Sequence, residues 1–81
     1  MEEILREFER KLAQCRVRSG TTKTHMSRVS TYLNWCREHG EKPLEQGSLD
    51  QFLKSREDKR LMNNTIRDYT YSLTTFLKVM T

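Results

Sequence analysis

Apolar side chains recur at steps of three and four residues along most of this chain, and this spacing constrains the fold more than any other feature. The clearest run is formed by Ile66, Tyr69, Leu73, Phe76, Leu77 and Met80. Because an α-helix completes a turn about every 3.6 residues, side chains at these steps share one face. A single proline and three glycines leave long stretches without helix breakers. We therefore predict an all-α fold.

The first two helices are predicted by one apolar stripe each and by residues that suit helix ends. The first spans residues 2–15. Thr21 or Thr22 caps the second helix, because a threonine hydroxyl accepts a hydrogen bond from an otherwise unpaired amide of the first turn. This helix ends at His39, and Gly40 follows at the position where a helix end favours left-handed backbone.

Two further helices are predicted by their starts. Ser48 and Gln51 form a capping box, in which each side chain satisfies a backbone amide at the start of the third helix. That helix is short and ends near Lys54–Asp58. Asn63 or Asn64 caps the fourth helix, which carries the apolar run described above.

We expect these elements to pack as one compact four-helix bundle, a single domain over residues 1–81. Its predicted core consists of the striped residues Leu5, Phe8, Leu12, Val29, Leu33, Phe52, Leu53, Ile66, Leu73, Phe76 and Leu77. His25 shares the buried face of the second helix and is interpreted as a core residue rather than a catalytic base. Cys15 and Cys36 also lie on apolar stripes, which predicts two buried, reduced thiols.

Positive charge is concentrated in the second helix and the loop before it. Residues 13–40 carry Arg16, Arg18, Lys23, Arg28 and Arg37 against Glu38 alone, a balance of +4 that equals the net charge of the whole chain. A polyanion is the natural partner for such a surface, although a membrane surface or an acidic protein would also fit. Neither a secretory signal nor a transmembrane run appears, so we expect a cytoplasmic, DNA-associated chain with no membrane partner.

The outward face of the second helix carries small hydroxyls and an amide, where solvated helices usually carry Glu, Lys and Gln. We interpret this face, with Trp35 along its flank, as a DNA-contact surface. Its residues are Arg18, Thr21, Thr22, Lys23, Thr24, Ser27, Arg28, Thr31 and Asn34. Small polar side chains allow close approach and donate to phosphate oxygens or base edges. The amides of Thr21–Thr24 add an anion site at the positive end of the helix dipole. The alternative is a solvated face without a partner.

The outward face of the fourth helix provides a second candidate surface. Its residues are Arg67, Tyr71, Thr74, Thr75 and Lys78. A tyrosine beside two cations suits nucleic-acid contact, while Asp68 on the same side opposes it. Tyr71 could equally pack on a neighbouring domain.

No pattern in the sequence predicts catalysis, a cofactor or a metal. Cys15, His25, Cys36 and His39 make a formal Cys2His2 set, but no C-x-x-C knuckle is present and both cysteines lie on apolar stripes. There is no glycine-rich phosphate loop either. We therefore expect a chain that is not an enzyme and that needs no cofactor.

Several short motifs follow one another in a set order. They are Thr21 or Thr22 opening a long helix, Trp35-Cys36-Arg37-Glu38-His39-Gly40, Pro43 in a loop, Ser48-Leu49-Asp50-Gln51-Phe52-Leu53 and Asn64-Thr65-Ile66. In order and spacing, the stretch from Ser19 to Met80 resembles the N-terminal core-binding domain of tyrosine recombinases, the phage-integrase family. That family usually has a tyrosine where this chain has His25.

The resemblance implies a SAM-like bundle of four helices that forms one half of a C-shaped clamp on duplex DNA, with its second and fourth helices facing the DNA. The family's catalytic half, with an Arg, an H-x-x-R pair and a nucleophilic Tyr, is not in this sequence. The implied function is a non-catalytic DNA-binding domain, with a C-terminal catalytic domain as its partner in a parent chain. Two alternatives remain: a helical domain that binds an acidic protein, and a helix-turn-helix regulator, which needs a tighter turn than Gly40–Gly47.

Overall fold

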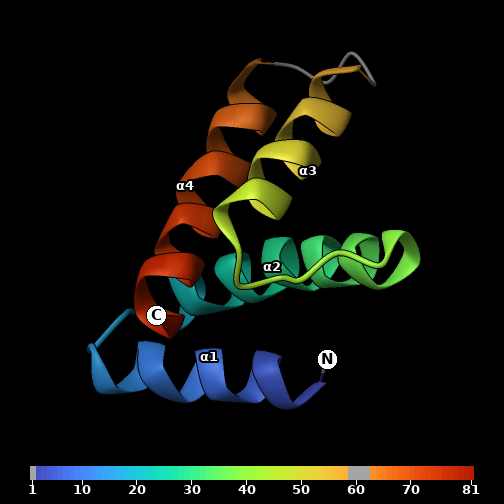
Figure 1. Ribbon diagram of the computed structural model, residues 1–81. Helices are drawn as coiled ribbons and strands as arrows, with labels where there is room; N and C mark the ends of the chain where they lie inside the picture. Colours follow the sequence, from blue (N-terminus) through green and yellow to red (C-terminus); the bar gives the residue numbers. More distant parts are fainter. Residues whose placement is uncertain (1, 59–62) are drawn as a thin grey trace.

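Four α-helices form the part of the chain that the computed structural model describes, residues 2–58 and 63–81 (Figure 1). They are α1 (Glu2–Gln14), α2 (Ser19–His39), α3 (Gln46–Asp58) and α4 (Asn63–Met80). No strand occurs within these two ranges. The prediction of an all-α four-helix bundle is therefore confirmed.

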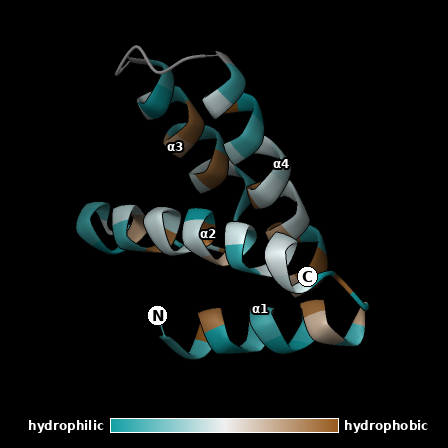
Figure 2. Cartoon of the chain, turned by 180° about the vertical axis from the view of Figure 1, so that it is seen from behind, coloured by the Kyte–Doolittle hydropathy of each residue, from teal (hydrophilic) through white to brown (hydrophobic). Residues whose placement is uncertain are grey.

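The helices pack so that α2 lies at the centre of the arrangement. α3 and α4 run side by side, α2 crosses them, and α1 lies along the other side of α2 (Figure 1). The hydrophobic segments of α1 lie on the side that faces α2 (Figure 2). The radius of gyration is 12.1 Å, close to the value of about 12 Å expected for a compact domain of this length.

The core is built from aromatic rings that meet edge to face. The ring centroids of Phe8 and Phe76 are 5.1 Å apart, and Tyr32 contacts both Phe52 at 5.2 Å and Phe76 at 6.2 Å. Edge-to-face pairs of this kind are favoured because the positive ring edge meets the negative ring face. The Tyr32 hydroxyl donates to the Pro43 carbonyl at 2.8 Å, so the loop after α2 is tied to the core.

Seven of the eleven predicted core residues are buried: Phe8, Leu12, Val29, Leu33, Phe52, Leu73 and Phe76. Leu5, Leu53 and Leu77 are half-buried and pack against this cluster. Ile66 is half-buried but does not belong to the cluster, so its place in the predicted core is wrong. The core also includes Tyr32, Trp35, Cys36 and Leu49. The prediction that Trp35 flanks the outward face is wrong, because its side chain is only 9 % exposed.

The end of α1 corrects the expectation of two buried thiols. Arg16 adopts left-handed backbone with φ 58°, and the Val17 amide donates to the Leu12 carbonyl at 3.1 Å. This pattern ends a helix and returns the chain toward the core. The helix therefore ends at Gln14, and Cys15 is exposed in the turn. Cys36 is buried as predicted, and burial raises the pKa of its thiol.

The start of α2 lies earlier than the predicted threonine cap. Arg18 is the N-cap residue with extended backbone and makes no side-chain capping hydrogen bond, and the helix begins at Ser19. Neither Thr21 nor Thr22 is therefore the cap. At the other end, Gly40 has left-handed backbone with φ 66°, and its amide donates to the Cys36 carbonyl, as predicted for this glycine.

The start of α3 also differs from the prediction. The helix begins at Gln46, so Ser48 lies inside it and is not a cap. The Ser48 side chain is buried, and its hydroxyl donates to the Glu41 carboxylate at 3.2 Å instead of to the backbone. For α4, the helix begins at Asn63, so Asn63 and Asn64 both lie inside its first turn and neither is the cap, and the residue that precedes Asn63 lies outside the described residues.

Candidate nucleic-acid interface

All fourteen predicted DNA contacts reach solvent. Thr22, Arg28, Thr31 and Thr75 are half-buried, and the other ten are exposed. Tyr71 stands out among them, because 62 % of this large side chain is exposed.

Two sets of contacts join α2 and α4 next to their outward faces. The first is made by Arg28, whose Nη1 donates to the Ser72 hydroxyl at 2.9 Å and to the Asp68 carbonyl at 3.4 Å. Its Nη2 also lies 3.7 Å from the Asp68 carboxylate. The second is made by Tyr71, whose ring lies 5.3 Å from that of His25. The two predicted surfaces therefore meet along one seam.

His25 is the buried polar residue of this seam. Its Nδ1 shares a hydrogen bond of 2.8 Å with the Ser72 hydroxyl, and both side chains are buried. Burial, with a smaller contribution from the Arg28 guanidinium, lowers the pKa of His25 below its ordinary value. A neutral imidazole is therefore favoured at neutral pH, and it holds Ser72 in place to accept from Arg28.

Three threonine hydroxyls on these faces are already used as donors. Thr24 donates to the Gly20 carbonyl at 3.1 Å, Thr31 to Ser27 at 3.2 Å, and Thr75 to Tyr71 at 2.9 Å. Such bonds to the carbonyl four residues earlier are common for threonine within helices. In this arrangement the three hydroxyls can accept hydrogen bonds, for instance from base amino groups, but have no free proton for a phosphate.

The anion-binding end of α2 lies slightly before the predicted position. Because the helix begins at Ser19, the Thr22 amide already donates to the Arg18 carbonyl at 2.8 Å. The amides free of intrahelical bonds are therefore those of Ser19–Thr21, rather than those of Thr21–Thr24. No acidic residue lies in this first turn, and a Cβ added to Gly20 would meet no atom within 4 Å. The backbone there is open to an approaching anion.

Most cations on this surface form no ion pair with the side chains of residues 2–57 and 64–81. The ion pairs among these side chains are Arg10 with Glu7 and Arg28 with Asp68. Arg28 is therefore tied to the protein itself, which leaves Arg18, Lys23, Arg67 and Lys78 as exposed cations. Arg67 donates to the Asn64 side chain at 3.4 Å, a weak interaction that a phosphate would displace.

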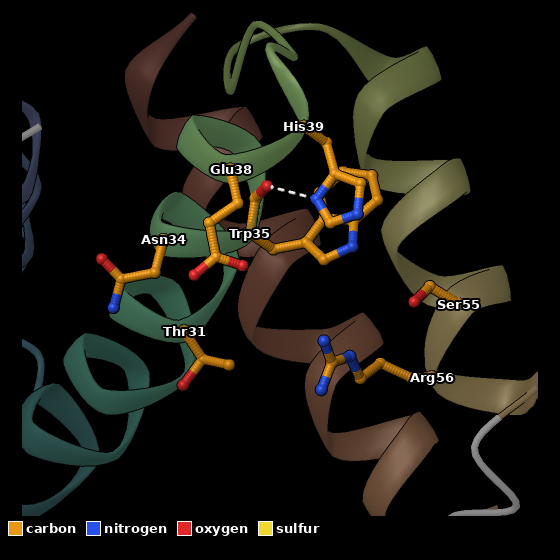
Figure 3. A pocket seen from close by; sticks show the side chains of 7 residues that line it. All are labelled: Thr31, Asn34, Trp35, Glu38, His39, Ser55 and Arg56. Carbon is orange, nitrogen blue, oxygen red and sulfur yellow. Dashed lines mark hydrogen bonds between the residues drawn. The ribbon is translucent and has the colours of Figure 1, made fainter.

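A groove between α2 and α3 lies beside this surface, and several of its lining residues were not among the predicted DNA contacts (Figure 3). Its volume is about 320 Å³, and it is lined by Thr31, Asn34, Trp35, Glu38, His39, Ser55 and Arg56. The rings of Trp35 and His39 stack 4.5 Å apart, and His39 Nδ1 lies 2.9 Å from the Trp35 carbonyl. The sequence spacing could have placed Arg56 beside Phe52, because Arg56 lies four residues later and hence on the same helix face.

The formal Cys2His2 set is not gathered into a site. Cys15 is exposed, Cys36 is buried, His25 bonds to Ser72 and His39 stacks on Trp35. Among the described residues, no three histidine, cysteine or acidic side chains lie close enough to hold a metal ion. None of the helices described is long and apolar enough to span a membrane.

Comparison of this chain with family models, with curated proteins and with solved structures found no match.

Proposed function

We propose that this chain is a non-catalytic DNA-binding domain that grips duplex DNA as one half of a clamp in site-specific recombination. The observation that carries the proposal is the seam at which Tyr71 meets His25 and Arg28 meets Asp68. This seam unites the α2 and α4 faces into one surface with exposed cations. In the recombinases that the sequence resembles, the corresponding two helices face DNA, and a catalytic domain completes the clamp.

The composition of this surface suits a polyanion with flat, polar edges. Lys23 and Arg18 lie beside the open amides at the start of α2, where phosphates would gain from both charge and hydrogen bonds. Asn34 lies further along the same helix and has the side chain best suited to pairing with adenine in a major groove. Tyr71 contributes an exposed ring with a polar tip.

Phosphate contacts and base contacts should respond differently to substitution. Removing a phosphate-holding charge at Lys23 should weaken binding to every sequence about equally. Replacing Asn34 with alanine should change the preference between sites more than the overall affinity. Binding should be modest, with a dissociation constant of about 10⁻⁴–10⁻⁶ M at physiological salt, because phosphate contacts dominate non-specific affinity.

The test is an amide chemical-shift titration of the chain with a short DNA duplex. We expect shifts over residues 18–34 and around Tyr71, and an affinity that falls steeply as salt is raised. Lys23→Ala should weaken binding, whereas Lys42→Ala, an exposed lysine in the loop after α2, removes the same charge and should have little effect.

Two outcomes would refute the DNA proposal. One is binding that holds steady from low to high salt, because phosphate contacts release counterions and are always salt-dependent. The other is a titration in which residues 18–34 stay silent while the acidic start of α1 responds. The second outcome would favour a helical domain that binds a protein partner.

A further inference from the structure

The α2–α3 groove contains a cation without an ion-pair partner among the side chains of residues 2–57 and 64–81. This cation is Arg56, which is half-buried. Its Nε is shielded from solvent and has no hydrogen-bond partner among these residues. A shielded charged donor without an acceptor is unfavourable, so a ligand that brings an acceptor gains free energy there.

The Arg56 guanidinium is held in place from beneath. Its central carbon lies 4.8 Å from the centroid of the Phe52 ring, a cation–π contact. Phe52 is itself fully buried and packs edge to face against Tyr32 and Trp35. The two terminal nitrogens point from α3 into the groove, toward α2 (Figure 3). A guanidinium fixed in this way suits bidentate binding of an oxyanion.

Neutral polar side chains line the same groove. The Ser55 hydroxyl points toward the groove from α3, and Asn34 lines it from α2 (Figure 3). The Trp35 carbonyl can only accept a hydrogen bond, so His39 Nδ1 carries the proton and donates it to that carbonyl. His39 Nε2 takes no part in this hydrogen bond. The groove volume of about 320 Å³ is sufficient for a phosphate with an attached sugar.

One carboxylate opposes an anion in this groove. Glu38 lines it from α2, but its side chain is exposed, whereas Arg56 is half-buried. Water and salt screen an exposed charge more strongly than a partly buried one. The guanidinium therefore dominates the local field, and Glu38 acts to weaken anion binding.

We propose that this groove binds one phosphate ester group, with the Arg56 guanidinium as its main ligand and the Ser55 hydroxyl as a neutral donor. Asn34 and Thr31 also belong to the α2 face assigned to DNA, so the source of the phosphate rests on the proposed function. On bound DNA the group is a backbone phosphate of the duplex. Without DNA it is the phosphate of a free nucleotide.

The first experiment follows the Arg56 Nε–H signal in nitrogen-15 spectra of the wild-type chain. The chain is titrated with a short duplex and, separately, with a deoxynucleoside monophosphate, each at constant ionic strength. We expect the Arg56 signal to shift, while the mononucleotide leaves the Arg10 signal in place, because Arg10 already pairs with Glu7 on α1. An Arg56 signal that ignores both ligands would overturn the proposal without any variant.

The second experiment compares Arg56→Gln with Arg10→Gln, which removes the same charge from a distant helix. Arg56→Gln should lower duplex affinity roughly five- to tenfold and reduce the salt slope by about 0.9, the share of one phosphate contact. Arg10→Gln should change affinity less than about twofold. Arg56→Lys keeps the charge without the planar fork and should recover only part of the loss.

Glu38→Gln separates an anion site from a site for a cation or a zwitterion. We expect it to raise phosphate affinity roughly two- to fivefold, the effect of one exposed charge, and a weakening would overturn the proposal. If the duplex binds but Arg56→Gln behaves like Arg10→Gln, the inference fails and the DNA function stands. If the duplex does not bind but the mononucleotide shifts Arg56, the inference stands and the DNA function fails.

Discussion

Replacement of Phe76 by alanine tests the packing of this bundle most directly. The Phe76 side chain is fully buried between Phe8 on α1 and Tyr32 on α2. Truncation removes the buried ring and leaves a cavity, which costs about 3–5 kcal/mol in protein cores. A domain of this length is stable by about 4–12 kcal/mol, taking about 0.05–0.15 kcal/mol per residue. The variant should therefore lose a large share of its stability.

The natural assay is urea unfolding followed by tryptophan fluorescence. Trp35 is the single tryptophan of the chain and is only 9 % exposed, so its emission reports the loss of the core. Phe76→Leu should cost less, about 1–2 kcal/mol, because a leucine fills much of the space. Pairing it with Phe8→Leu in a double-mutant cycle should give a coupling of about 0.5–1.5 kcal/mol for the aromatic pair.

The control is Thr74→Ala, an exposed substitution two residues away on the same helix. It should change stability by less than about 0.5 kcal/mol. The packing argument is refuted if Phe76→Ala unfolds at the same urea concentration as Thr74→Ala with an unchanged slope, because both measures would then show no lost core contact.

Three further substitutions and one titration test the local reasoning. Because the pKa of His25 is lowered in the folded state, its neutral form stabilises the fold, and this contribution to the free energy of unfolding is complete above the ordinary pKa of 6.5 and is lost as pH falls. The melting temperature should therefore drop on acidification, and it should drop less in His25→Gln. Gly40→Ala should destabilise by about 1–2 kcal/mol, because φ is 66° there. Gly47→Ala, at a helical site with open space, should stabilise by up to about 1 kcal/mol in the same thermal assay. Arg16→Gly should raise the urea midpoint by relieving left-handed backbone at φ 58°, and a lower midpoint would contradict this.

Helix interiors were predictable because their cause is local. The apolar run ending at Met80 shares one face whatever surrounds it, and α4 indeed extends to Met80. Helix starts were less predictable, because several nearby residues are capable of capping. Ser48 illustrates the difficulty: its hydroxyl is a good cap in isolation, but in the fold it is buried and donates to Glu41. The hydrogen bond to Glu41, seven residues earlier in the chain, replaces the capping bond that Ser48 would make to a backbone amide of its own helix.

The candidate site divides in the same way. The outward positions of Lys23, Asn34 and Tyr71 follow from helical period alone, and all three are exposed. Their meeting along a seam depends on how α2 and α4 cross, which no local pattern encodes. The sequence does not distinguish Arg56 from the other arginines. Its proposed role as a phosphate ligand depends on the Phe52 ring that it contacts and on α2, which lies across the groove.

Helical periodicity alone predicts the all-α class, the four helices, most of the core and the faces left to solvent, because burial at helical period is a local property. Three features depend instead on how the helices pack and turn: the pairing of Arg28 with Asp68, the exposure of Cys15 in a turn, and the groove beside Trp35. Each of these depends on residues distant in the chain or on the turn between helices. Their energies arise from contacts that exist only after the helices have packed.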